Sequence, residues 1–119
     1  MAKDLEHQEQ SALIRWAALQ SKVMPELKLL FAIPNGGHRH IVTAVKLKAE
    51  GQKAGVPDLM LPVARNGYNG LFIEMKKAKG GTVSAAQKQW HNDLIEQTYK
   101  VDVCHGWDQA KAVLTEYLA

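Results

Sequence analysis

The chain has 119 residues, of which 46 % are hydrophobic and 23 % charged, values typical of one folded domain and not of a disordered or fibrous protein. Its formal net charge of +3 permits a polyanionic partner without establishing one. No apolar run approaches the roughly 20 residues that span a bilayer, no signal-peptide pattern opens the chain, and the single cysteine, Cys104, excludes an internal disulfide, so we expect a protein of the reducing cytosol.

The first half of the chain predicts two helices and one strand. Residues 4–21 carry apolar side chains at three- and four-residue spacing, which predicts a helix that ends before Pro25. The apolar run at 28–33 predicts a short buried strand, and the Pro-Asn-Gly-Gly run at 34–37 predicts a turn. A second helix is expected from 39 to about 50, with an inward apolar face made of Ile41, Val42, Val45 and Ala49.

The next segment predicts two strands joined by a hairpin, followed by a third helix. The apolar runs at 58–63 and 70–77 predict the strands, and the composition of 65–69 is typical of a hairpin turn. Ser84 and Gln87 form a capping-box pattern that predicts the start of the helix. The side chains expected to bury this helix are Trp90, Leu94 and Ile95.

The last segment predicts a strand at 100–104 and a closing helix at 108–118. The inward side chains of the closing helix are expected to be Ala110, Val113, Leu114 and Leu118. The resulting order, α-β-α-β-β-α-β-α, predicts an α/β fold in which a small mixed β-sheet is flanked by helices. We expect a single domain over residues 1–119.

Three polar residues on the predicted hairpin point to chemistry. Asp58 opens one strand, whereas Glu74 and Lys76 are two residues apart on the other and therefore share a face. A carboxylate and an ammonium group on a strand rich in apolar residues are unfavourable to bury without partners. Two converging carboxylates, completed by the main-chain carbonyl of Met75, would suit Mg²⁺ or Mn²⁺. With a lysine to orient the attacking water and stabilise developing charge, such a site would support phosphodiester hydrolysis.

The specificity of this pattern comes from its combination and not from its parts. A Glu-x-Lys pair alone is most often a solvent-facing ion pair of little energetic value. Here Pro57-Asp58 begins one apolar strand, a hairpin follows, and Glu74 and Lys76 end the next apolar strand.

Further motifs occur in order along nearly the whole chain. They are Pro34-Asn35-Gly36-Gly37 with Arg39, Lys48-Ala49-Glu50-Gly51, Gly55-Val56-Pro57-Asp58-Leu59, Gly70-Leu71-Phe72-Ile73-Glu74-Met75-Lys76, and Ser84-Ala85-Ala86-Gln87 with Trp90 and Leu94. In this order they resemble the PD-(D/E)XK nuclease superfamily and, within it, the virus-type replication-repair nuclease (VRR-NUC) domain.

This resemblance implies a restriction-endonuclease-like core and a structure-selective DNA endonuclease that needs Mg²⁺ or Mn²⁺. Stand-alone phage or bacterial members of this length look like Holliday-junction resolvases that act as homodimers. Paired active sites suit this task, because two symmetrically placed strands of a four-way junction must be cut. We therefore expect branched DNA as the partner and the cytoplasm of a bacterial or phage-infected cell as the location.

The superfamily also implies an acidic residue from the first helix and a role for Gln87. Glu6 and Glu9 are the candidates for the acid, and we prefer Glu6 because the family pattern looks like Glu-x-x-x-Gln, which matches Glu6 and Gln10. A helix N-terminus also favours carboxylates without any function. Gln87 shares a helix face with Trp90, so it could contact the metal-bound water or a phosphate, although its capping-box role with Ser84 also explains it.

Candidate DNA contacts follow from the turn before the second helix and from exposed lysines. Backbone N–H groups of Asn35, Gly36 and Gly37, together with Arg39, could hold a phosphate, and a plain turn with an exposed arginine is the alternative. Lysines near the site could follow a phosphate backbone, although each alone is more often a solvated side chain; the candidates are Lys48, Lys77 and Lys79.

Other interpretations keep some of these features. A restriction-like or flap nuclease shares the hydrolytic residues, and a non-catalytic DNA-binding module would keep the fold without needing them. The histidines and Cys104 lack the spacing of a structural zinc site, so Cys104 is expected to pack as a small hydrophobic residue. No Gly-rich nucleotide-binding loop follows a strand, so we expect no small-molecule cofactor.

Overall fold

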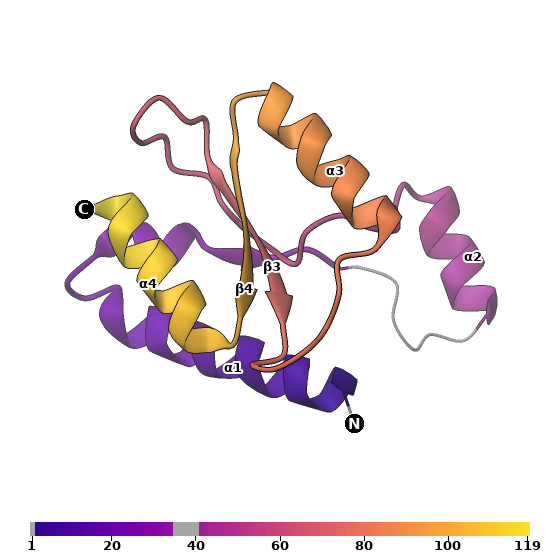
Figure 1. The fold of residues 1–119 in the computed structure, drawn as a ribbon, viewed down its shortest axis with the longest axis horizontal. Coiled ribbons are helices and arrows are strands. Elements are labelled where there is room, and N and C mark those ends of the chain that lie inside the picture. The colour runs from indigo at the N-terminus through magenta and orange to yellow at the C-terminus, as the bar shows by residue number, and fades with distance from the viewer. Residues whose placement is uncertain (1, 35–40) are drawn as a thin grey trace.

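The structure is a computed structural model that describes residues 2–34 and 41–119, with side chains described for 5–34 and 43–119. Its elements follow the predicted order, with one additional 3-10 helix, and form a sheet flanked by helices (Figure 1). The elements are α1 (Ala2–Gln20), η1 (Pro25–Leu29), β1 (Phe31–Ala32), α2 (Ile41–Ala49), β2 (Leu59–Leu61), β3 (Leu71–Lys76), α3 (Ala85–Glu96), β4 (Lys100–His105) and α4 (Trp107–Leu118). The expected α/β fold class is confirmed.

The sheet has the order β1-β2-β3-β4, with antiparallel pairing between β1, β2 and β3 and parallel pairing between β3 and β4. The parallel pair requires a crossover connection, which α3 supplies. Strand β3 lies between β2 and β4, and all six of its residues are buried. The polar end of this strand is therefore enclosed by protein on both faces.

Helices α1 and α4 pack on one face of the sheet, and α3 covers the other (Figure 1). The alternating side chains of β3 divide between these layers as the period of two predicts. Leu71, Ile73 and Met75 join the hydrophobic core with residues of α1 and α4. Glu74 and Lys76 instead reach Gln87 on α3. The polar face of β3 thus lies beneath the first turn of α3.

The predicted strand at 28–33 is wrong over most of its length. Pro25 starts a 3-10 helix, in which the Leu27 amide donates to the Met24 carbonyl at 3.0 Å. Proline fixes φ near the helical value, which favours this turn over an extended chain. Only Phe31 and Ala32 remain as a strand, and both are exposed at the edge of the sheet. The apolar run therefore does not form a buried strand.

The predicted inward face of the second helix is also wrong where it can be checked. Val45 is 63 % exposed and Ala49 is exposed, while the side chains of Ile41 and Val42 lie outside the described residues. Helix α2 stands away from the body (Figure 1). The Cα radius of gyration, 14.4 Å, accordingly exceeds the value of about 13.5 Å expected for a compact domain of this length. Apolar periodicity gave the helix correctly but could not show whether it has a packing partner.

The predicted hairpin turn at 65–69 and the capping box are confirmed, whereas the turn predicted at 34–37 lies largely outside the described residues. Arg65 and Tyr68 exchange two backbone hydrogen bonds around Asn66 and Gly67, whose φ values are +53° and +84°. Both halves of the capping box at Ser84 are present. The expectation for Ile95 is wrong, because this side chain is 54 % exposed.

The closing segment packs largely as predicted. Ala110 and Leu114 on α4 are fully buried, and Cys104 on β4 is buried as a small hydrophobic residue. Among the described residues, no helix combines the length and apolar character needed to cross a membrane.

Candidate active site

Asp58 lies one residue before β2, where its carboxylate turns toward the neighbouring strand. Its Oδ2 accepts a hydrogen bond from the Met75 amide at 2.7 Å. This bond joins residues 17 positions apart in the chain and places the carboxylate beside the polar end of β3. The predicted convergence of Asp58 and β3 is therefore present, although Asp58 precedes the strand instead of opening it.

Glu74 is the most deeply buried ionisable residue of the site, with 2 % of its surface exposed. Its Oε2 accepts a hydrogen bond from Gln87 Nε2 at 3.1 Å. Burial, and then the neighbouring Asp58 carboxylate, raise the pKa of Glu74 to about 9, against the smaller opposing effect of Lys76. Without an added positive charge, burial and the Asp58 carboxylate therefore disfavour the ionised state of Glu74.

Lys76 and Gln87 connect β3 to the first turn of α3. Lys76 is 7 % exposed, and its Nζ donates to Gln87 Oε1 at 3.2 Å. The same oxygen accepts from the Ser84 amide at 2.8 Å, which is the reciprocal half of the capping box. A Cβ added at Gly81, whose φ is +77°, would lie 3.5 Å from the Lys76 stem, so this glycine leaves room beside the side chain. The capping role of Gln87 and its contact with the site thus coexist in one side chain.

The two acidic candidates on α1 point to different places. Glu9 Oε1 accepts a hydrogen bond from the Trp107 amide at 2.8 Å. It thereby satisfies an N–H group at the start of α4, where a carboxylate is also favoured by the helix dipole. Glu6 is half-buried and close enough to contribute to the raised pKa of Glu74. Glu9 is therefore engaged at the start of α4, and Glu6 remains the candidate for the acidic residue of the site.

Met75 presents its backbone to the site. The Met75 amide donates to Asp58, whereas the Lys76 carbonyl accepts from the Gly106 amide at 3.0 Å on the opposite edge of β3. Since adjacent residues of a strand direct their backbone groups to opposite edges, the Met75 carbonyl lies on the Asp58 edge. The predicted carbonyl ligand is thus on the correct side.

The donor set fits a hard divalent cation. Asp58, Glu74 and the Met75 carbonyl supply oxygen atoms, which are the ligands Mg²⁺ and Mn²⁺ prefer. Glu74 Oε1 is buried and has no hydrogen-bond partner, so one carboxylate oxygen is available. Within residues 2–34 and 41–119, no three His, Cys, Asp or Glu side chains form a metal cluster by themselves. A bound ion would therefore complete its shell with water or phosphate oxygens, as Mg²⁺ usually does.

His91 belongs to this neighbourhood but was not among the predicted site residues. It lies on α3 one turn after Gln87, is 9 % exposed, and has its Nε2 3.5 Å from Glu74 Oε1. Burial and the positive charge of Lys76 lower the pKa of His91, which favours a neutral ring. Its spacing of four residues from Gln87 was the available signal, because positions i and i+4 share one helix face.

The candidate DNA-contacting lysines are spread around the site. Lys48 is exposed on α2 and lines a hollow of about 440 Å³ with Lys53 and Gln52. Lys77 follows β3, with its carbonyl 3.2 Å from His105 Nδ1, and Lys79 is exposed in the next loop. The remaining candidates lie outside the described residues; they are Asn35, Gly36, Gly37 and Arg39.

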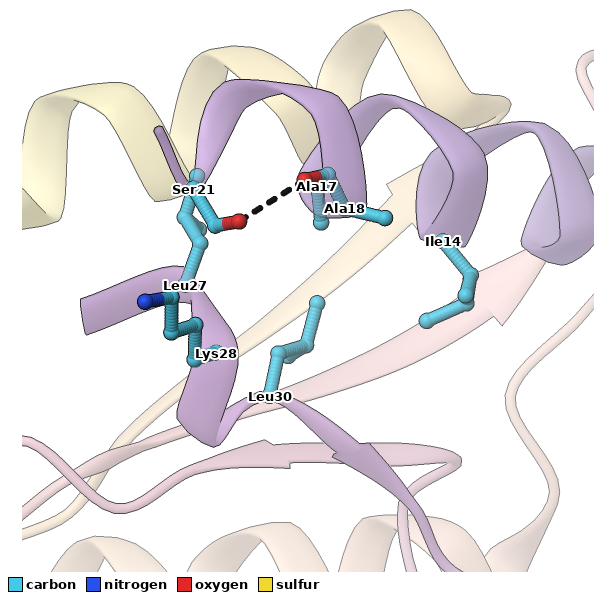
Figure 2. A pocket seen from close by; sticks show the side chains of 7 residues that line it. All are labelled: Ile14, Ala17, Ala18, Ser21, Leu27, Lys28 and Leu30. Atoms are coloured by element: carbon cyan, nitrogen blue, oxygen red, sulfur yellow. Dashed lines mark hydrogen bonds between the residues drawn. The ribbon is translucent and has the colours of Figure 1, made fainter. Parts of the chain in front are cut away.

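A cavity of about 300 Å³ between α1 and η1 lies apart from this chemistry (Figure 2). Its lining is Ile14, Ala17, Ala18, Ser21, Leu27, Lys28 and Leu30. The Ser21 hydroxyl is already used, since it donates to the Ala18 carbonyl at 2.7 Å. The described residues that line the cavity include no carboxylate, so they do not form a metal centre.

Comparison with known proteins identifies the family. The model of the VRR-NUC domain matches residues 2–108. This chain belongs to the VRR-NUC family. A solved structure described as a VRR_NUC domain protein aligns with a TM-score of 0.80 and 32 % sequence identity, over 94 % of this chain and 86 % of that chain. No match was found among curated proteins.

Membership of the VRR-NUC family makes the chain a nuclease of the PD-(D/E)XK type, with DNA as its substrate. The members of this family generally use divalent metals. Of the residues predicted for the motif, Glu74 and Lys76 contact Gln87 on α3, and Asp58 contacts the Met75 amide on the same strand.

Proposed function

We propose that this VRR-NUC protein is a metal-dependent, structure-selective DNA endonuclease that resolves four-way junctions. The observation that carries the metal-dependent chemistry is a pair of neighbouring carboxylates, buried Glu74 and half-buried Asp58. Glu74 is enclosed beside Asp58, and together with burial this proximity raises the pKa of Glu74 to about 9. A structure that holds a buried carboxylate beside a half-buried one is poised for a cation.

The ligands we propose for Mg²⁺ or Mn²⁺ are Asp58, Glu74 and the Met75 carbonyl, with Glu6 contributing from α1. When bound, the ion polarises the scissile phosphate and lowers the pKa of a water molecule. The hydrogen bond from the Met75 amide orients Asp58, and the hydrogen bond from Gln87 orients Glu74. Outer hydrogen bonds of this kind fix ligand geometry and tune affinity.

Lys76 is proposed as the electrostatic catalytic group. Its Nζ donates a hydrogen bond to Gln87 Oε1 at 3.2 Å. Lys76 itself lies two residues after Glu74 on the same face of β3. A fixed positive charge in an enclosed site stabilises the charge that develops on the phosphate during hydrolysis. Gln87 positions both Lys76 and Glu74, so the distance between these groups depends on one amide side chain.

Contacts with the DNA backbone are proposed for lysines outside the enclosed centre. Lys48 and Lys53 line one hollow next to the loop that leads into Asp58, and Lys77 and Lys79 follow β3. Neutralising phosphates with such side chains releases counterions, so binding should weaken steeply as salt rises. We also propose the segment with Asn35, Gly36, Gly37 and Arg39 as a phosphate contact.

The preference for four-way junctions is proposed together with a homodimer. Each chain carries one set of Asp58, Glu74 and Lys76, and symmetric resolution requires two cuts. A two-fold dimer would present two identical sites to the two strands. The proposed setting is the cytoplasm of a bacterial or phage-infected cell.

The test is cleavage of a labelled four-way junction beside matched linear duplex, flap and single strand, each with Mg²⁺, Mn²⁺ or EDTA. Wild type is compared with Asp58→Ala. We expect paired symmetric cuts in the junction that need the metal and disappear in the variant. Cleavage of flaps or plain duplex instead would retain the nuclease and reject the junction specificity, whereas tight binding without any cleavage would reject the enzyme.

A further inference from the structure

Glu74 has a second neighbour on α3 besides Gln87. His91 lies four residues after Gln87, so both side chains leave the same face of the helix toward β3. Gln87 Nε2 donates to Glu74 Oε2 at 3.1 Å, and His91 Nε2 lies 3.5 Å from the other oxygen, Oε1. The two carboxylate oxygens thus face two different side chains from consecutive turns of one helix.

The contact between His91 and Glu74 is incomplete. Both His91 Nε2 and Glu74 Oε1 are buried without a hydrogen-bond partner among the described residues. Buried polar atoms are nearly always paired, so two facing unpaired atoms call for an explanation. A distance of 3.5 Å is just beyond a good N–H···O bond, and a small movement of either side chain would form one.

We infer that His91 is a positioning residue for Glu74, whose Nε2–H holds Oε1 while Gln87 holds Oε2, so that the carboxylate is fixed in the orientation that binds the metal. This inference rests on the proposed metal-dependent function. A neutral imidazole carries one N–H group, and the tautomer with the proton on Nε2 is the donor that Oε1 requires.

The arrangement explains how a buried carboxylate can remain a usable ligand. Each carboxylate oxygen has two lone pairs, so one hydrogen bond to each oxygen leaves capacity for an ion. Two donors at opposite ends of the group remove its rotational freedom more effectively than one. His91 itself is 9 % exposed, so it acts through Glu74 and does not touch DNA.

The alternative is that His91 merely fills space under α3. In that case a ring of similar shape without nitrogen atoms would serve equally well. His91→Phe tests this, because it keeps an aromatic ring and removes the donor. His91→Gln is the matched rescue variant, because its amide can place an N–H group near the position of Nε2.

The experiment measures direct binding of Mn²⁺ to the full chain in the absence of DNA, from the EPR signal of free Mn²⁺. Thermal unfolding of each variant in EDTA gives the metal-free stability. We expect His91→Phe to bind Mn²⁺ about 10- to 100-fold more weakly, the usual effect of losing an outer hydrogen bond to a metal ligand. His91→Gln should recover most of the affinity, and neither variant should unfold at a lower temperature in EDTA.

Asp58→Ala in the same assay separates the two levels of the proposal. If wild type binds Mn²⁺ no better than Asp58→Ala, the proposed metal centre fails, and the role of His91 fails with it. If Asp58→Ala loses binding while His91→Phe binds as wild type does, only the role of His91 is overturned. Equal losses in His91→Phe and His91→Gln, or a fall in metal-free stability that accounts for the loss, would assign His91 to packing and overturn the inference.

Discussion

Gln87 combines a helix cap with a bridge across the site, and these two roles can be separated by substitution. Ser84→Ala removes the hydroxyl that accepts a hydrogen bond from the backbone N–H of Gln87 at 3.1 Å. It leaves the bond from the backbone N–H of Ser84 to the side-chain oxygen of Gln87. Gln87→Ala removes the other half of the capping box together with the bonds to Lys76 and Glu74. Both variants weaken the start of α3, and only Gln87→Ala also removes the hydrogen bonds that link α3 to Lys76 and Glu74.

The magnitudes follow from these contacts. Loss of the Ser84 cap costs about 1 kcal/mol of stability. Gln87→Ala loses a comparable cap and, in addition, two partly buried side-chain bonds, which brings the expected loss to about 2 kcal/mol. For a chain of this size these values correspond to falls in unfolding temperature of roughly 4 °C and 8 °C. Neither loss should unfold the protein at the temperature of a cleavage assay.

The assay pairs thermal unfolding with single-turnover cleavage of DNA, both at the same salt and metal concentration. We expect Ser84→Ala to cleave at nearly the wild-type rate and Gln87→Ala to cleave about 10- to 100-fold more slowly. If Gln87→Ala cleaved as fast as Ser84→Ala, Gln87 would be only a cap. Its proposed positioning of Lys76 and Glu74 would then be wrong.

Three further predictions concern other parts of the fold. Glu9→Ala should lower stability by about 1 kcal/mol through loss of the α4 cap, with cleavage preserved, whereas Glu6→Ala should lower Mn²⁺ affinity, with stability preserved. If instead Glu9→Ala lowered Mn²⁺ affinity and Glu6→Ala lowered stability, the placement of the two acids would be rejected. Tyr117→Phe removes the buried hydroxyl that donates to the Val63 carbonyl at 2.6 Å and should destabilise by about 1–2 kcal/mol in denaturant unfolding, whereas an unchanged midpoint would contradict that bond. Burial raises the pKa of the Cys104 thiol from 9.0 to about 12, so the native protein at pH 8 should resist alkylation of this thiol. The stability that this group contributes should be complete below pH 9 and lost as the pH rises toward 12. Rapid labelling of the native protein would contradict this prediction.

Features that depend on local chain geometry were predictable from the sequence. The period of two placed Glu74 and Lys76 on one face of β3, and the structure shows that face under α3. The capping box at Ser84 fixed the start of α3, because its hydrogen bonds join residues only three apart. Both results follow from backbone geometry, which neighbouring residues largely determine.

Features that depend on partners distant in sequence were not predictable. The apolar residue Val45 predicted a buried helix face, but Val45 is 63 % exposed on α2, which stands away from the rest of the described elements. The partner of Glu9 is the Trp107 amide, which is 98 residues away in the chain, and no local pattern indicated this contact. The contact between His91 and Glu74 joins α3 to β3, and the spacing of His91 from Gln87 alone did not reveal it. In each case tertiary packing, and not local propensity, decided the outcome.

The measurement that tests the central claim most directly compares DNA binding with DNA cleavage for Lys76→Ala in the presence of Mn²⁺. Lys76 lies beneath α3 with 7 % of its surface exposed, so its loss should not remove a major DNA contact. The account predicts nearly unchanged DNA affinity and cleavage slowed by at least about 10²-fold, the usual loss for an electrostatic catalytic group. Cleavage by Lys76→Ala at the wild-type rate would contradict the assignment of this buried centre as the site of hydrolysis.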